Sequence, residues 1–167
     1  IHLMGSHLSY QSRYPSDFGK FFINNKSGQY DNSVLYTDYF LQKLVAHFNK
    51  MPNFRGLVYF SDHGEGINYG KDHDPGAFIF DMTYIPFFIY LSDGYIKENP
   101  RKYQILKSEV NYYFTNDLIY NTMLGIMGIK DKRNYEPQND LTSGSYDNNI
   151  ERFTTLFGRK AIKEDTK

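Results

Sequence analysis

Cysteine is absent from the 167 residues of this sequence. A disulfide framework and a thiolate zinc site are therefore both excluded. No apolar run approaches the ~20 residues that a membrane-spanning helix needs, so the sequence itself contains no candidate span. Lysine and arginine total 19, aspartate and glutamate also total 19, and the formal net charge is +0. Because no basic stripe runs along the chain, nucleic acid is not an expected partner.

The most informative segment is residues 57–65, which read Leu-Val-Tyr-Phe-Ser-Asp-His-Gly-Glu. Its apolar first half predicts a buried strand that ends at Ser61. In open α/β sheets, ligands bind beyond the carboxyl ends of the strands, which is where Asp62 and His63 fall. A carboxylate beside an imidazole offers oxygen and nitrogen donors suited to Zn²⁺ or Mn²⁺. Taken alone, the pair fits a polar loop after a strand equally well.

The rest of the pattern predicts a layered α/β arrangement. We expect strands over 1–4, 57–60 and 85–91, a helix from a cap at Asp31 or Asn32 to about Lys50, and a helix over 118–129. The near-continuous apolar run at 85–91 is typical of a parallel strand covered on both faces. Residues 64–84 form a long, glycine-containing connection, and connections of this length are often functional. We expect a polar surface excursion over 134–149 and a frayed tail over 160–167.

An ordered set of motifs extends from His2 to about Ile129. It comprises His2-Leu3-Met4-Gly5-Ser6-His7, Arg13-Tyr14-Pro15, the segment from Tyr30 to Asp38, the segment from Ser61 to Glu65, His73, and the segment from Ile85 to Ser92. This set resembles the lipid A phosphoethanolamine transferases, which belong to the sulfatase-like, alkaline-phosphatase superfamily. The resemblance implies an alkaline-phosphatase-like α/β fold, with a mostly parallel sheet flanked by helices. It also implies that residues 1–167 are the C-terminal part of a catalytic domain, present as a partial domain.

The resemblance further implies a metal-dependent enzyme. Such enzymes transfer phosphoethanolamine from phosphatidylethanolamine to lipid A, a core sugar or another envelope acceptor, through a phosphothreonine intermediate. The family's threonine nucleophile and a glutamate metal ligand have no counterpart in this sequence, so we expect a fragment that is inactive alone. The family is anchored in the inner membrane by N-terminal helices, with its catalytic domain facing the periplasm. It usually carries disulfides, from which this cysteine-free chain departs.

The resemblance assigns Asp62 and His63 to metal ligation, with Zn²⁺ as the expected ion and Mn²⁺ as the alternative. His7 and His73 match histidines that line the phosphoryl pocket, where they would donate hydrogen bonds to the transferred group or hold a second metal. Without the family context, each lone histidine would more often be structural. With only two protein ligands, we expect this chain alone to bind zinc weakly or not at all.

Two further residues are candidates for supporting roles. Ligating histidines usually give their second N–H to a carboxylate, which makes Glu65 a candidate for orienting one, although a solvent-facing acid is an equal alternative. His2 is expected to be structural or supporting. Neither Ser6 nor Ser61 lies in the Gly-x-Ser-x-Gly elbow of a serine nucleophile. A partial sheet would also leave an unpaired edge, through which the fragment could self-associate.

Two other functions remain open from the sequence. A sulfatase-like hydrolase or a phosphoglycerol transferase of the same superfamily would keep the fold and the metals but differ in its nucleophile or substrate. A non-catalytic domain that binds envelope glycans or a protein partner would need no metal. Metal content separates the enzymes from the binding domain.

Overall fold

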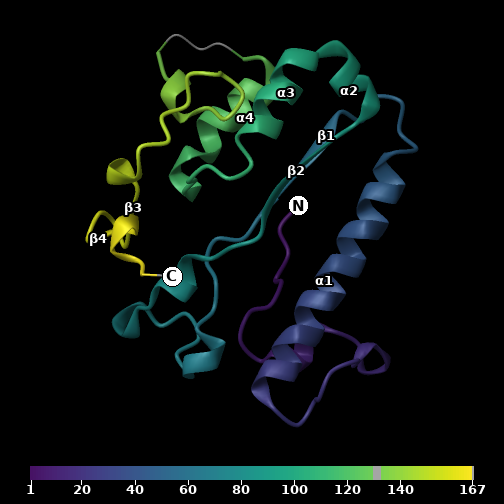
Figure 1. The fold of residues 1–167 in the computed structure, drawn as a ribbon. Coiled ribbons are helices and arrows are strands. Elements are labelled where there is room, and N and C mark those ends of the chain that lie inside the picture. The colour runs from purple at the N-terminus through teal and green to yellow at the C-terminus, as the bar shows by residue number, and fades with distance from the viewer. Residues whose placement is uncertain (130–132, 167) are drawn as a thin grey trace. The chain divides into compact units, whose positions relative to one another are not determined.

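The computed structural model describes residues 1–129 and 133–166. The chain forms two compact units, residues Ile1–Ser92 and Asp93–Lys167, here unit 1 and unit 2. In Figure 1 the colours of unit 1 run from purple to teal and those of unit 2 from green to yellow. The helices and strands that position the candidate site all belong to unit 1.

The largest element of unit 1 is the helix α1, Lys26–Phe48. The extended residue Asn25 precedes it, and its side chain accepts a hydrogen bond from Gly28 N at 2.7 Å. An asparagine in this conformation is a favoured N-cap. The predicted cap at Asp31 or Asn32 is therefore wrong, because Asn25 caps the helix earlier in the chain.

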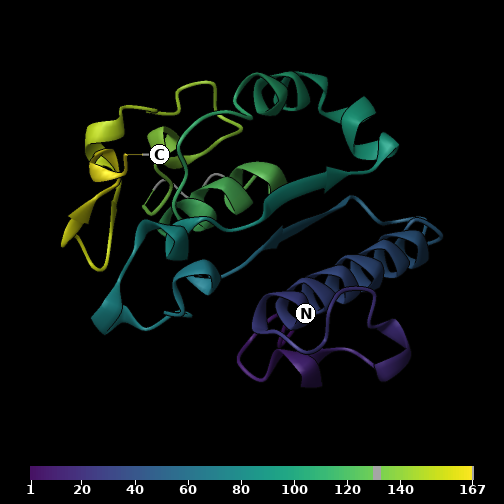
Figure 2. The ribbon, with the colours of Figure 1, turned by 60° about the horizontal axis from the view of Figure 1, so that its bottom comes forward.

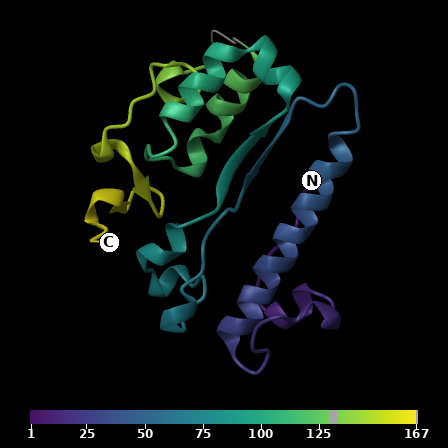
Figure 3. The same ribbon diagram turned by 45° about the vertical axis from the view of Figure 1, so that its right-hand side comes forward.

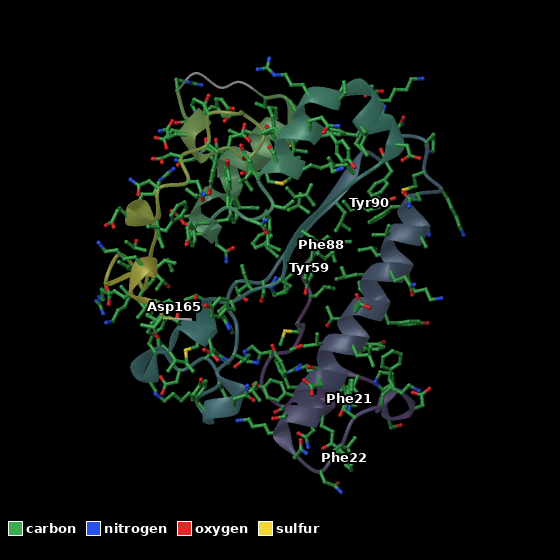
Figure 4. The ribbon with its side chains drawn as sticks, viewed as in Figure 1. Phe21, Phe22, Tyr59, Phe88, Tyr90 and Asp165 are labelled. Carbon is green, nitrogen blue, oxygen red and sulfur yellow. The ribbon has the colours of Figure 1, made fainter. Side chains whose placement is uncertain are left out.

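Asn32 instead anchors the loop that precedes α1. Its side chain is 0% exposed, and its Oδ1 accepts hydrogen bonds from Lys20 N at 2.7 Å and Phe21 N at 2.9 Å. A Cβ atom on Gly28 would lie 2.0 Å from Phe22 O, so only glycine fits at this contact. Figure 4 shows Phe21 and Phe22 in this loop, beside the first turns of α1. The loop is thus packed closely on the helix.

Strands β1, Gly56–Phe60, and β2, Phe87–Leu91, pair with each other. The pair is antiparallel, with Gly56 opposite Leu91 and Phe60 opposite Phe87. The rings of Tyr59 and Phe88 face each other across the strands at 5.2 Å (Figure 4).

The predicted parallel arrangement is wrong for the strands that the structure describes. A parallel pair needs a crossover connection, usually a helix, and no α-helix lies between β1 and β2. The predicted burial of both strands is also wrong for this chain, because no residue of β1 or β2 is fully buried, and Phe60 and Phe88 are 42% and 40% exposed. Residues 1–4, predicted as a strand, have no regular structure.

The C-terminal end of α1 is tied to β2. Asn49 Nδ2 donates a hydrogen bond to Tyr90 Oη at 2.8 Å. The ring of Phe54 also packs beside those of Phe48, at the end of α1, and Tyr90, in β2, with centroid distances of 5.4 and 6.1 Å. Figure 3 shows α1 extending alongside the strand pair.

The connection from β1 to β2 is irregular, as predicted. It contains three short 3-10 turns, η3 at Ile67–Tyr69, η4 at Pro75–Ala77 and η5 at Phe80–Thr83. Two backbone hydrogen bonds fold it onto itself, from Gly64 N to Met82 O at 2.7 Å and from Gly66 N to Asp72 O at 2.5 Å. These contacts hold the residues that follow β1 close to residues further along the connection.

Unit 2 is mainly helical. It contains α2 at Asp93–Glu98, α3 at Pro100–Ser108 and α4 at Ile119–Met127, the teal and green helices of Figure 2. The predicted helix over 118–129 is confirmed, with its end at Gly128, whose φ of 71° lies in the left-handed region that favours glycine. Lys102 Nζ donates to Gly125 O at 2.5 Å and ties α3 to α4.

The predicted surface excursion over 134–149 holds only in part, because many of its residues are exposed but the segment also supplies part of the core of unit 2. Asp140 is 0% exposed, and Leu141 and Tyr146 are also buried. The Asp140 carboxylate accepts hydrogen bonds from the Tyr135 hydroxyl at 2.5 Å and from Thr142 N at 2.7 Å. Polar residues that satisfy one another can be buried, which composition alone does not reveal.

The last residues carry regular structure where a frayed tail is predicted. Strand β3, Thr154–Thr155, pairs antiparallel with β4, Lys160–Ala161, and the 3-10 turn η9 follows at Ile162–Glu164. Lys167, the end of the predicted tail, lies outside the described residues. Across residues 1–129 and 133–166, no helix has both the length and the hydropathy to cross a bilayer.

Candidate active site

Three histidines from separate segments of unit 1 form one ring cluster. The rings of His63 and His73 have centroids 4.5 Å apart, and those of His7 and His73 are 5.3 Å apart. His63 follows β1, His73 lies in the connection to β2, and His7 lies in the N-terminal segment. The structure thus brings together the three histidines that the sequence singles out for chemistry.

The environment of His63 fixes which ring nitrogen faces a ligand. Its Nδ1 lies 2.9 Å from Gly64 O, which can only accept, so Nδ1 carries the proton. In the neutral ring the lone pair is then on Nε2. Asp62 Oδ1 lies 3.9 Å from this Nε2, and the Asp62 side chain is 88% exposed. Carboxylate and imidazole therefore present one donor atom each toward a common region.

Glu65 pairs with His73. Its Oε1 lies 2.9 Å from His73 Nδ1, and its side chain is only 5% exposed. The second oxygen, Oε2, is buried and accepts no hydrogen bond of normal geometry from any described residue. A carboxylate beside Nδ1 orients the ring and favours Nε2 as the atom that meets a ligand. Glu65 is therefore a buried partner of His73 and not the solvent-facing acid that the sequence left open as an alternative.

The donor set fits a divalent cation. His63, Glu65 and His73 each offer one ligand atom, and these atoms lie within 4.8 Å of one another. Imidazole nitrogens and carboxylate oxygens are ordinary ligands of Zn²⁺ and are also compatible with Mn²⁺. A buried carboxylate oxygen without a hydrogen bond is costly unless a charged partner or a proton occupies the space beside it. His63, Glu65 and His73 could therefore hold a metal, and Asp62 with His63 could supply two ligands of a larger set.

Two residues without a predicted role, Tyr10 and Lys26, bind the carboxylate of Asp72, which precedes His73 in the sequence. The Tyr10 hydroxyl donates to Asp72 Oδ1 at 3.2 Å, and Lys26 Nζ lies 2.6 Å from the same carboxylate. The hydrogen bond from Lys26 lowers the pKa of Asp72. Burial raises the pKa of Tyr10, and the charges of Glu65 and Asp72 raise it further. Asp72 adjoins His73 in sequence, but nothing in the local pattern indicates its distant partners.

The N-terminal histidines differ in their surroundings. His7 N donates to Met4 O at 3.3 Å, and Arg13 Nε donates to His7 O at 3.2 Å. A backbone hydrogen bond and the Arg13 side chain therefore both hold the turn that carries His7. His2 is exposed and is not part of the ring cluster. The supporting role expected for His2 thus has no contact behind it among the described residues.

The sulfatase family model matches residues 1–129 of this chain. The chain therefore belongs to the sulfatase family, which gives it an alkaline-phosphatase-like α/β class. The described part shows helices and two small antiparallel strand pairs within that class.

Curated relatives point to one branch of this family. Phosphoethanolamine transferase EptA of Salmonella typhimurium is 30% identical over 161 residues, which cover 78% of this chain and 27% of the relative. Phosphoethanolamine transferase EptC of Escherichia coli O18:K1:H7 is 32% identical over 121 residues, 62% of this chain and 21% of the relative. Phosphoethanolamine transferase CptA of Salmonella typhimurium is 25% identical over 168 residues, 87% of this chain and 28% of the relative.

The resemblance inferred from the motifs is therefore confirmed. The chain spans about a quarter of the length of these relatives. No solved structure gives a significant match.

Proposed function

We propose that this chain is the C-terminal part of the catalytic domain of a metal-dependent phosphoethanolamine transferase. The proposed donor is phosphatidylethanolamine, and the proposed acceptor is lipid A, a core sugar or another envelope component. One observation carries the proposal: His7, His63 and His73 converge from three segments into one ring cluster. The names of the relatives support the transferred group. We place the domain on the periplasmic side of the inner membrane.

Asp62 and His63 are the proposed metal ligands, with the remaining ligands outside this chain. Their donor atoms lie 3.9 Å apart, and the contact of His63 Nδ1 with Gly64 O leaves Nε2 for the metal. When bound, Zn²⁺ or Mn²⁺ would polarise a phosphoryl oxygen and lower the pKa of a nearby hydroxyl. The alternative is a metal held by His63, Glu65 and His73, whose donor atoms all lie within 4.8 Å of one another.

His73 and His7 are the proposed contacts to the transferred group. His73 Nδ1 is hydrogen-bonded to Glu65, so Nε2 of that ring is left to contact a phosphoryl oxygen. A second ring, His7, lies 5.3 Å away and can contact another oxygen of the same group. Because the phosphoryl group is negatively charged throughout, positioning and charge stabilisation are the main work of these residues.

The proposed reaction has two displacement steps. A threonine hydroxyl outside this chain attacks phosphorus, its O–P bond forms, and the bond to diacylglycerol breaks, with a proton returned to the leaving oxygen. The acceptor hydroxyl then attacks the phosphorus of the phosphothreonine, its O–P bond forms, the bond from phosphorus to the threonine oxygen breaks, and the acceptor's proton passes to that oxygen. Splitting one difficult transfer in this way is the advantage of covalent catalysis. Since the nucleophile lies elsewhere, this chain alone is expected to be inactive.

The test is a transfer assay on the intact protein with a fluorescent phosphatidylethanolamine and purified lipid A. His73→Ala is expected to reduce transfer by at least ~100-fold, the scale of losing one charge-stabilising donor. His47→Ala is the matched control, because His47 lies on α1 outside the ring cluster. No transfer by the metal-loaded wild type, or full activity of His73→Ala, would contradict the proposal. Free phosphoethanolamine without a modified acceptor would indicate a hydrolase instead.

A further inference from the structure

The backbone just before His73 is held in an unusual conformation. Asp72 has a φ of 47°, in the left-handed region that residues other than glycine seldom adopt. Its carbonyl accepts a hydrogen bond from Gly66 N at 2.5 Å, and Lys71 N donates to Gly66 O at 3.2 Å. Residues 66–72 therefore form a closed loop between Glu65 and His73. A left-handed residue persists only where its surroundings determine it.

Two side chains from other elements fix Asp72. Lys26 Nζ, from the first turn of α1, lies 2.6 Å from Oδ1 and 2.7 Å from Oδ2. The hydroxyl of Tyr10, which is 2% exposed, donates to Oδ1 at 3.2 Å. The carboxylate is thus held on the chain's first long helix and on the 3-10 turn η1, Tyr10–Arg13. Lys26 and Asp72 are 46 positions apart in sequence, so this contact joins distant parts of unit 1.

Tyr10 is itself held firmly in unit 1, where it is 2% exposed. The Tyr10 ring itself is fixed by an edge-on contact with Tyr30 at 5.2 Å.

We infer that Lys26 and Tyr10 are positioning residues for His73, which act by holding Asp72. This inference rests on the proposed function, in which His73 contacts the phosphoryl group. The ring of His73 has two ring neighbours, His63 at 4.5 Å and His7 at 5.3 Å, and its Nδ1 contacts Glu65. Release of Asp72 frees the backbone torsion next to His73, so the ring loses this alignment although its own side chain is unchanged.

Histidine NMR of the 167-residue chain tests this without metal or activity. In the wild type, contacts between the His73 and His7 rings are expected from nuclear Overhauser effects. Asp72→Asn keeps the shape and tolerates left-handed backbone but loses the charge. This substitution and Lys26→Met are expected to shift the His73 ring signals and to weaken the His7 contacts. Lys26→Arg, which keeps the charge, should restore them, and Tyr10→Phe should give a smaller shift.

The control is Lys160→Met, which breaks the ion pair with Glu164 in unit 2. The Lys26 and Lys160 side chains are similarly exposed, at 48% and 46%. Such exposed pairs contribute little to stability, so the melting temperatures of these variants should stay close to that of the wild type. A purely structural role would instead lower the melting temperature of Lys26→Met and leave the ring contacts of the folded protein intact. That result, or unchanged His73 signals in Asp72→Asn, overturns the inference.

Transfer by the intact protein provides the second arm. Loss of an outer partner of a site histidine typically costs 10–100-fold, so Asp72→Asn should reduce kcat by about that factor while KM for the lipid changes little. If the intact wild type shows no transfer, the proposed function fails, but the NMR arm still decides whether Asp72 positions His73. If the rings move and kcat does not, His73 positioning by Asp72 has no catalytic role and the inference fails.

Discussion

The imidazoles of His63 and His73 lie 4.5 Å apart and are tilted by 31°. The segment between them folds back through the contact of Gly66 N with Asp72 O at 2.5 Å. His63 is oriented by a backbone carbonyl and His73 by the carboxylate of Glu65. Two rings in contact thus have different hydrogen-bond partners, and both partners leave Nε2 of the ring to meet a ligand. The proposal that His63 binds the metal and His73 contacts the phosphoryl group comes from the family resemblance.

Loss of either proposed metal ligand should abolish transfer without unfolding the protein. Asp62→Ala and His63→Ala in the intact protein are each expected to reduce transfer by at least ~100-fold. The Asp62 side chain is 88% exposed, so its removal should change the free energy of unfolding by less than ~0.5 kcal/mol. Transfer is followed with labelled lipid and stability by thermal unfolding. Normal transfer by either variant would refute its assignment.

Zinc titration of this chain should distinguish the two metal arrangements. With Asp62 and His63 as the only ligands, calorimetry is expected to show weak binding, because catalytic zinc sites normally have three protein ligands. Asp62→Asn should weaken it further, and Glu65→Gln should leave it unchanged. Tight stoichiometric binding that disappears in Glu65→Gln would assign the metal to His63, Glu65 and His73 instead.

The sequence indicated the site better than the architecture around it. The change from apolar to polar residues after Phe60 is local, so the strand end and the Asp62–His63 pair could be read directly. The direction of β2 could not be predicted in this way, because an apolar run is compatible with either strand direction. The burial of Asp140 could not be predicted from the sequence, because its partners Tyr135 and Thr142 approach it only when the segment folds.

The contacts that hold the site were beyond sequence reasoning for the same reason. Lys26 lies before the start of the predicted helix, and the local sequence around Asp72 shows only that it adjoins His73. Their pairing across 46 positions depends on how α1 meets the connection after β1. Asn25 and Asn32 are both plausible caps by residue type, and only the packing of the loop on α1 separates their roles.

Asn32 should contribute strongly to the stability of unit 1. Its side chain accepts from Lys20 N and Phe21 N, at 2.7 and 2.9 Å, and donates to Phe21 O at 3.2 Å. Asn32→Ala leaves these backbone groups without partners, at a cost of about 1–3 kcal/mol for each group that stays buried. Chemical denaturation measures the loss. Asn24→Ala, in the exposed part of the same loop, is the control and should change stability by less than ~0.5 kcal/mol. Equal effects of the two variants would contradict the anchoring role.

A pH-dependent stability is expected from Glu109, at the end of α3. Burial raises its pKa to about 7, to which the charge of Asp140 contributes, and its Oε2 is buried without a hydrogen bond from any described residue. The folded state therefore binds this proton more tightly than the unfolded state, whose pKa is near 4.5. The associated stability is fully present below the unfolded pKa and is lost as pH rises through the folded pKa of about 7.

Glu109→Gln removes this ionisation and keeps the shape of the side chain. Its melting temperature should exceed that of the wild type by a few degrees at about pH 8, where the wild type carries a buried charge, and the gap should close at about pH 5. Circular dichroism at the two pH values measures both. Asp38→Asn, at an exposed position of α1, is the control, and it should not reproduce the gain in melting temperature at about pH 8. A Glu109→Gln advantage that is the same at both pH values would show that the mutation acts through packing and not through the proton.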